Sequence, residues 1–278
     1  MQIQKLVHCP AKIAYPEDGY AIELTAGPDG EHAKALVLDG VSRAYSPTEG
    51  AQLFQGLTGG QLVVEAAKLS FLHTVEKNPR VIMQETNRRI AVLAKDNGMP
   101  LDQPHLLPGT TFALAMVGPL CTEVLQVGDA FVVWWTKNGV IGGTKNQVFA
   151  HDTAATRILR KLRKQNGENE QKTWGDFIGP LNRLRTFHVN KCVRGGYGLL
   201  NGQPESEAFW RRLIFNPDEL KLLLLFTDGL VPLVETQDSQ SLAELVVRLY
   251  QDGGLPAILA HTREKGYDAE ATALALEF

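Results

Sequence analysis

The sequence predicts an α+β fold, in which antiparallel strands and paired helices occupy separate stretches of the chain. Three observations lead to this prediction. Residues 109–150 hold four short β-type runs separated by Gly or Asn-Gly turns. Residues 51–98 carry apolar side chains at helical spacing. The chain does not alternate strand, helix and strand in the manner of a parallel βαβ sheet.

The N-terminal half begins with a predicted hairpin, whose strands at residues 20–24 and 33–40 flank the turn-rich stretch "TAGPDGEH". Residues 51–77 are predicted to form one interrupted helix, and residues 80–98 a second helix that a glycine closes. An antiparallel meander follows, with its strands in residues 109–118, 121–130, 131–139 and 140–150.

The C-terminal half begins with a polar and partly helical segment, approximately residues 151–191, that interrupts the strands. Residues 195–215 return to β character, and the apolar strand at 220–229 follows. Two helices, at 241–254 and 255–267, lead to a closing strand at 271–278. We find no internal repeat, low-complexity tract or linker in the sequence. We therefore expect a single domain over residues 1–278, with residues 151–191 as an inserted flap.

Composition excludes several classes of function. The chain of 278 residues is 44% hydrophobic and 21% charged, as in ordinary globular proteins. A net charge of −3 gives no basic surplus for nucleic acid, and no apolar run is long enough for a membrane span or a signal peptide. Three scattered cysteines, without a CxxC pair, argue against a disulfide framework or a zinc site. We expect a cytoplasmic protein without nucleic-acid or membrane partners.

Acidic residues recur at the edges of the predicted strands. Burying an unpaired carboxylate costs several kcal/mol, so an acid directly after an apolar strand needs a partner. The acids in such positions are Glu17, Asp18, Asp39, Asp129, Asp228, Asp268 and Glu270. If these acids meet at one sheet edge, their mutual repulsion calls for cations, and hard divalent ions such as Mg²⁺ and Mn²⁺ prefer carboxylate oxygens. A plain Asp-Gly turn, or a turn capped by Asp129, is the structural alternative.

Six short segments resemble, in family order, the metal-dependent serine/threonine phosphatases of the protein phosphatase 2C type. "PEDGYAI" resembles that family's Asn-Glu-Asp segment, and "LVLDGVSRAYSPTEGAQLF" resembles its first Asp-Gly motif. "GTTFALAMVG" and "VLQVGDAFVVWW" are similar to its Gly-Ser/Thr-Thr strand and Val-Gly-Asp-Ser hairpin. "LLLFTDGL" resembles its Ser/Thr-Asp-Gly-Leu motif, and "ATALAL" its final strand. The resemblance runs from about Pro16 to the C-terminus.

The resemblance implies an αββα sandwich of two antiparallel β-sheets flanked by α-helices, with two Mg²⁺ or Mn²⁺ ions in a cleft at one edge. Asp39 would bridge both ions, the Gly40 carbonyl would bind one, and Asp228 would ligate the other. Asp18, alone or with Glu17, would act through metal-bound waters. With Asp39 and Asp228 as the catalytic acids, a water bridging the ions would attack phosphoserine or phosphothreonine of a protein.

The chain departs from the family pattern at two places. Ala269 and Glu270 stand where the family has Asp-Asn or Asp-Asp, so either Asp268, through a bulge, or Glu270, through its longer side chain, would bind the metal. Ile13 stands at the phosphate-holding arginine, beside Lys12, which would attract phosphate without the bidentate fork of arginine. A weak or inactive phosphatase-like binding or regulatory module is therefore the alternative function. Hydrolysis of small metabolite phosphates shares the same chemistry.

Other side chains point to function less directly. The seven histidines show no metal-ligand spacing, and Ser42 and Ser46 have no hydrolase elbow around them. The basic run "RILRKLRK" in the flap is either a solvated face or a surface that recruits an acidic or phosphorylated partner. We therefore place the predicted chemistry on the strand-end acids.

Overall fold

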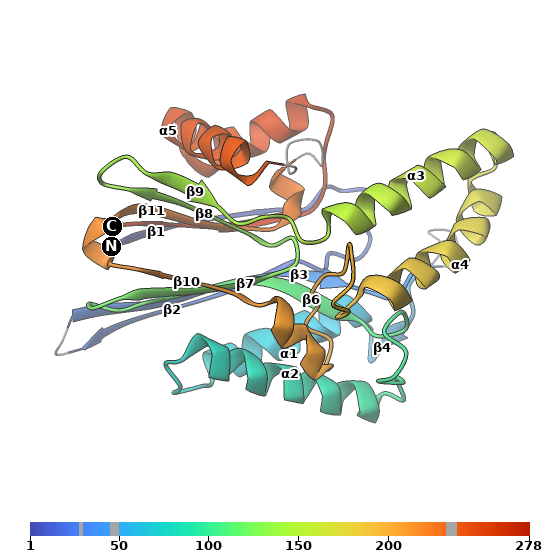
Figure 1. Ribbon diagram of the computed structural model, residues 1–278, viewed down its shortest axis with the longest axis horizontal. Helices are drawn as coiled ribbons and strands as arrows, with labels where there is room; N and C mark the ends of the chain where they lie inside the picture. The colour runs from blue at the N-terminus through green and yellow to red at the C-terminus, as the bar shows by residue number, and fades with distance from the viewer. Residues whose placement is uncertain (28–29, 45–49, 232–237) are drawn as a thin grey trace.

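The computed structural model of the protein describes residues 1–27, 30–44, 50–231 and 238–278. In these residues two five-stranded antiparallel sheets lie face to face, and helices cover both outer faces (Figure 1). The architecture is the αββα sandwich that we expected. The division into one domain with an inserted flap stays a prediction.

Strands distant in sequence make up each sheet. The first sheet has the order β10-β7-β6-β3-β2 and the second has the order β1-β12-β11-β8-β9. The bounds in the first sheet are β2 Gly19–Gly27, β3 Gly30–Val41, β6 Gly109–Val117, β7 Thr122–Val127 and β10 Arg211–Phe215. Those in the second are β1 Gln2–His8, β8 Phe131–Thr136, β9 Ile141–Gly143, β11 Leu220–Phe226 and β12 Ala271–Glu277.

Helices α1 (Gly59–Leu72) and α2 (Pro79–Asp96) cover the first sheet, and α5 (Ser239–Glu264) covers the second (Figure 1). Their starts follow from sequence. Thr58 and Gln61 form a capping box at α1, and Asn78 caps α2 with Pro79 at its first position. Helix α5 is kinked at Gly253 and Gly254, which agrees with the two predicted helices. Helices α3 (Phe149–Asn166) and α4 (Glu170–His188) form a hairpin beside the sandwich.

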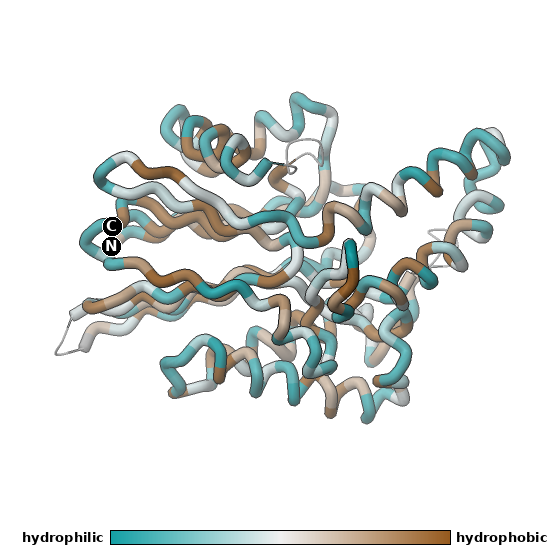
Figure 2. The backbone as a smooth tube through the Cα atoms, in the orientation of Figure 1, coloured by the Kyte–Doolittle hydropathy of each residue, from teal (hydrophilic) through white to brown (hydrophobic). Residues whose placement is uncertain are grey.

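The core has three layers, because side chains on each central strand alternate between its two faces. On β3, Ala35 and Val37 face the other sheet, whereas Leu36 and Leu38 pack with α1 and α2. On β11 the side chains of Leu223 and Leu225 likewise lie between the sheets. Those of Leu222, Leu224 and Phe226 pack against α5. Figure 2 shows the resulting hydrophobic strands at the centre of the molecule. The acids at the strand ends therefore sit at the margin of a dry core.

Three predictions about local structure were wrong. Residues 51–58 are not the start of a helix but contain a small hairpin, β4 (Leu53–Phe54) and β5 (Leu57–Thr58), with positive φ at Gln55 and Gly56. The expected meander is divided, because β6 and β7 belong to one sheet while β8 and β9 belong to the other. Residues 195–215 contain one strand only, preceded by the 3₁₀ helix η1 (Pro204–Phe209). Two further 3₁₀ turns are η2 (Pro217–Glu219) and η3 (Asp228–Leu230).

Within the described ranges, no helix combines the length and the apolar composition that crossing a bilayer requires.

Candidate metal centre

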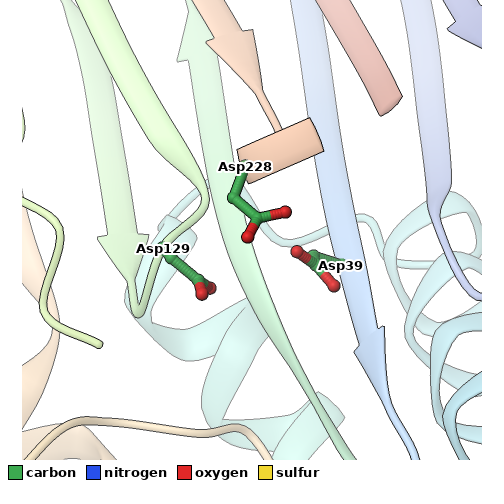
Figure 3. A group of neighbouring side chains, drawn as sticks. All are labelled: Asp39, Asp129 and Asp228. Carbon is green, nitrogen blue, oxygen red and sulfur yellow. The ribbon is translucent and has the colours of Figure 1, made fainter. Parts of the chain in front are cut away.

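Three carboxylates converge at one edge of the sandwich. Asp39, Asp129 and Asp228 each offer an oxygen atom, and these three atoms lie within 4.8 Å of one another. Figure 3 shows the side chains pointing toward a common centre from three different elements. All three residues are half-buried. We call these three residues the acid cluster.

Strand alternation and two tight turns place the cluster. Asp39 continues the inward-facing series of β3, two residues after Val37. Asp129 lies in the turn between β7 and β8, where Gly128 has a φ of 76° that favours glycine. Thr111, which pairs with Asp39 across β3 and β6, donates its hydroxyl to Asp129 Oδ1 at 2.9 Å. Asp228 opens the turn η3 directly after β11.

Asp18 and Glu270 adjoin the cluster through hydrogen bonds. The Glu270 carboxylate accepts the backbone N–H groups of Glu17 and Asp18 at 2.8 and 2.9 Å, so it holds the segment that carries Asp18. Asp18 Oδ2 accepts the hydroxyl of Thr227, the residue before Asp228, at 2.6 Å. The structure thus brings together four of the acids that were predicted to bind metal: Asp18, Asp39, Asp228 and Glu270.

The gathered charges change the acidity of each group. Burial, followed by the charges of Asp228, Asp18, Asp129 and Glu270, raises the pKa of Asp39 well above its usual range. Burial and the charge of Asp129 raise the pKa of Asp228 to about 7. The pKa values of Asp18, Asp129 and Glu270 are raised as well, with burial as the main cause. Without a cation, the folded protein therefore holds carboxylates that resist ionisation.

The donor set fits a hard divalent cation. Mg²⁺ and Mn²⁺ are held by a few carboxylate oxygens and waters. Three oxygen donors within 4.8 Å meet that requirement, and a cation at their centre would relieve the repulsion that raises their pKa values. Asp39 is the acid whose pKa is raised by the charges of Asp18, Asp129, Asp228 and Glu270 together.

Glu17 and Gly40 have structural contacts next to the cluster. The Glu17 carboxylate accepts hydrogen bonds from the Ser42 backbone N–H, at 3.1 Å, and from the hydroxyls of Ser42 and Thr58. It therefore lies at the N-terminus of α1. Gly40 donates its N–H to the Glu17 carbonyl at 3.2 Å, and a Cβ at Gly40 would come within 2.5 Å of that oxygen. The close approach requires glycine.

Asp268 and Lys12 lie apart from the cluster. Asp268 is 2.8 Å from His8 Nε2 and 3.6 Å from Arg263 Nε, and the hydrogen bond from His8 lowers its pKa. The exposed Lys12 also attracts this carboxylate. Glu270, rather than Asp268, is the acid that the structure brings next to Asp18.

Two acids of the site were not among the residues predicted to bind metal. Asp129 lies at a strand end like Asp39 and Asp228, but it follows a glycine instead of preceding one, and it also fits a capped turn. Asp152, in the first turn of α3, is the other, and burial together with the charges of Asp129 and Asp228 raises its pKa to about 8. No strand precedes Asp152, so only the fold reveals that α3 begins next to the cluster.

No protein-family model matches the sequence, and no curated protein sequence matches it. Solved structures do match. Serine/threonine phosphatase Stp1 from Staphylococcus aureus superposes with a TM-score of 0.57 at 14% identity, covering 100% of this chain and 94% of that one. The S. agalactiae serine/threonine phosphatase gives a TM-score of 0.55 at 13% identity, covering 100% and 99%. The chain has the fold of these phosphatases.

A third similar structure is the catalytic domain of serine/threonine protein phosphatase PstP, which was determined in complex with two manganese ions. It covers 99% of this chain and 96% of its own, with a TM-score of 0.52 at 14% identity. The sequence identities are low, so the likeness establishes the fold. The αββα sandwich implied by the short motifs is confirmed.

Proposed function

We propose that the protein is a metal-dependent phosphatase that removes phosphate from serine or threonine residues of proteins. The observation that carries this proposal is the convergence of Asp39, Asp129 and Asp228 within 4.8 Å, at a sheet edge of a phosphatase fold. The manganese complex of the similar PstP domain supports Mn²⁺ as the cofactor, and the oxygen donors suit Mg²⁺ equally. As in that domain, we propose that two ions bind.

Asp39 and Asp228 would hold the metal directly, with Asp129 as a further ligand. Asp18 would lie beside them, held by the hydrogen bond from the Thr227 hydroxyl. Glu270 would keep Asp18 in place through its hydrogen bonds to the backbone of Glu17 and Asp18. When bound, the ions would activate water for in-line attack and neutralise the phosphoryl oxygens. The roles of Gly40, Asp268 and Lys12 in metal or phosphate binding stay predictions.

The cytoplasm is the compartment that we propose. Cys9, Cys121 and Cys192 are all free and exposed, and free thiols are typical of reducing compartments.

Hydrolysis of p-nitrophenyl phosphate tests the proposed activity. We expect turnover with Mn²⁺ or Mg²⁺, none with EDTA, and a loss of at least a hundredfold in Asp39→Asn. Asp252→Asn is the matched control, because it removes one exposed negative charge from the outer helix α5. A folded wild-type protein without turnover at millimolar Mn²⁺ would instead favour a binding module.

A second comparison separates protein substrates from small metabolites. We expect a phosphoserine peptide to be hydrolysed with a higher kcat/KM than glycerol phosphate under the same conditions. The opposite preference would assign the site to small phosphate esters.

A further inference from the structure

A groove lies between α4 and the end of β3, beside the acid cluster. It has a volume of about 260 Å³. Its first wall includes Glu17, Ser42, Arg43 and Gly40, which follows Asp39 directly. Its second wall belongs to α4 and includes Trp174, Ile178 and Arg185. We call it the α4 groove.

Arg185 stands where the α4 groove meets the cluster. Its Nη1 donates a hydrogen bond to the Ser42 carbonyl oxygen at 2.8 Å. Among the residues that the structure describes, no salt bridge involves this half-buried guanidinium. Its charge nonetheless lowers the pKa of Asp152, whereas the charges of Asp129 and Asp228 raise it. Arg185 is therefore a cation beside the cluster that makes no ion pair with any carboxylate of the described residues.

A guanidinium in this position suits a phosphate group. Arginine presents two parallel N–H donors that match two oxygens of a phosphate, whereas its single bond to Ser42 leaves donors free. Arg43, an exposed residue on the opposite wall, adds a second positive charge to the groove. Glu17 also lines the groove, but its carboxylate already accepts hydrogen bonds from Ser42 and Thr58. The two guanidinium groups therefore remain as the donors that this groove offers to a phosphate.

The rest of the α4 wall is mainly apolar. Trp174, Ile178, Leu181 and Arg185 follow one another at intervals of four, three and four residues, so they share one face of the helix. Trp174 packs edge-on against Phe177, with ring centroids 5.6 Å apart. Eleven residues of helix rise about 16 Å, which is the length of an extended segment of about five residues. This wall suits a peptide better than a small metabolite.

We propose that the α4 groove binds the phosphorylated segment of a substrate protein, with Arg185 holding the phosphate and Trp174 and Ile178 contacting the residues beside it. This inference rests on the proposed phosphatase function, since the phosphate would lie between Arg185 and the acid cluster. It assigns phosphate recognition to a side chain of the α3–α4 hairpin.

Binding of a non-hydrolysable ligand tests the groove without turnover. The probe is a peptide that carries the phosphonate analogue of phosphoserine flanked by apolar residues, titrated calorimetrically in the presence of Mn²⁺. We expect the wild-type protein to bind it at least tenfold more tightly than the unphosphorylated peptide. We expect Arg185→Gln to lose at least tenfold in affinity. Equal binding of both peptides, or unchanged affinity in Arg185→Gln, would overturn the proposal.

Matched variants separate recognition from folding. Arg185→Gln removes the charge and keeps a polar side chain, and Arg185→Lys keeps the charge without the fork, so we expect intermediate affinity from the lysine variant. Arg183→Gln is the control, because Arg183 is exposed on the same helix and does not line the groove. Trp174→Ala should lose more affinity for the peptide than for inorganic phosphate. Equal losses for both ligands would contradict a peptide groove.

Turnover assays then distinguish the two proposals from each other. If Arg185→Gln keeps the wild-type KM for a phosphoserine peptide, the groove assignment fails while the phosphatase activity stands. If the wild-type protein binds the phosphonate peptide through Arg185 but releases no phosphate from the phosphoserine peptide, the activity fails while the groove assignment stands.

Discussion

At the scale of single residues, Asp39 is the carboxyl group of the site whose ionisation is opposed by the charges of four other acids. It lies at the end of an inward-facing series on β3. A neutral side chain of the same shape would relieve this repulsion. The chain instead keeps carboxylates that cost stability when they ionise, which is expected where a cation is to be bound.

The pH dependence of stability in the metal-free protein follows from these groups. The folded pKa of Asp152 is about 8 and that of Asp228 about 7, whereas both ionise near 3.8 when unfolded. The folded state therefore binds more protons above pH 4, and stability falls as pH rises toward 8. Burial lowers the pKa of His151 to about 4, which gives the opposite slope up to its ordinary 6.5.

Between pH 6.5 and 8, the change in stability therefore comes from the carboxylates and not from His151. We expect the free energy of unfolding in EDTA to fall by about 2 kcal/mol across this range, at about 1.4 kcal/mol per pKa unit. Asp152→Asn should flatten the slope, and millimolar Mn²⁺ should reverse it, because metal binding improves as the ligands ionise. Urea denaturation at several pH values measures this. A rising slope in EDTA would show that the acids are ionised without metal.

Glu17 is predicted to serve stability rather than metal binding, because its carboxylate accepts hydrogen bonds from Ser42 and Thr58. Glu17→Ala leaves these donors without their acceptor and should cost about 1–3 kcal/mol of unfolding free energy. We expect its Mn²⁺ affinity to stay within a few-fold of the wild type. Glu168→Ala, at an exposed position in the α3–α4 loop, is the control. A tenfold loss of metal affinity with unchanged stability would assign Glu17 to the metal.

At the scale of elements, the acids of the site lie at strand ends, and the sequence predicts this placement. Asp39 and Asp228 follow apolar runs that the sequence predicts as strands, and the structure places both acids near the ends of β3 and β11. Asp152 and Arg185 lie on polar helices, whose periodicity gives no information about what their ends contact. These residues reach the site through packing of the α3–α4 hairpin, which local patterns do not encode.

The errors in the secondary structure have a similar cause. The run 51–58 has apolar residues at helical spacing, but Gln55 and Gly56 adopt positive φ and turn it into the β4–β5 hairpin. The meander prediction failed because a Gly-Asp turn that continues a sheet looks the same in sequence as one that crosses to the opposite sheet. That crossing at Gly128 is what brings Asp129 to the cluster.

The turn η3 depends on Gly229, according to the structure. A Cβ at this position would overlap the backbone carbonyl of Glu270, which cannot move without shifting the start of β12. We expect Gly229→Ala to lose about 3 kcal/mol of stability or more. Gly175→Ala is the matched control, since a Cβ there meets open space inside α4, and it should stabilise by up to about 1 kcal/mol. Equal melting temperatures for both variants would refute this role of Gly229.

At the scale of the whole molecule, a packed sandwich carries a loosely attached hairpin. The sheets share a continuous apolar interior, whereas residues 157–172, at the far end of α3 and the start of α4, contain no buried side chain. Segments with few buried contacts open at low free-energy cost. The hairpin can therefore adjust to a bound segment while the acid cluster stays fixed by the sheets.

Limited proteolysis tests this division. We expect trypsin to cut first after basic residues between Arg157 and Lys172, leaving the sandwich as a resistant core. Addition of the phosphonate peptide with Mn²⁺ should slow this first cut. Mass spectrometry of early fragments locates the cuts. First cuts inside the strands, or a hairpin as resistant as the sheets, would contradict the proposed independence of the hairpin.

Anomalous diffraction at the manganese edge, on crystals soaked in Mn²⁺, tests the central claim most directly, because it locates the ions themselves. We predict anomalous peaks within coordination distance of Asp39 and Asp228, with Asp129 or Asp18 among the further ligands, and their loss in Asp39→Asn. An ordered, ligand-free acid cluster at millimolar Mn²⁺, or manganese bound only at other places, would contradict the account of this edge as a metal centre.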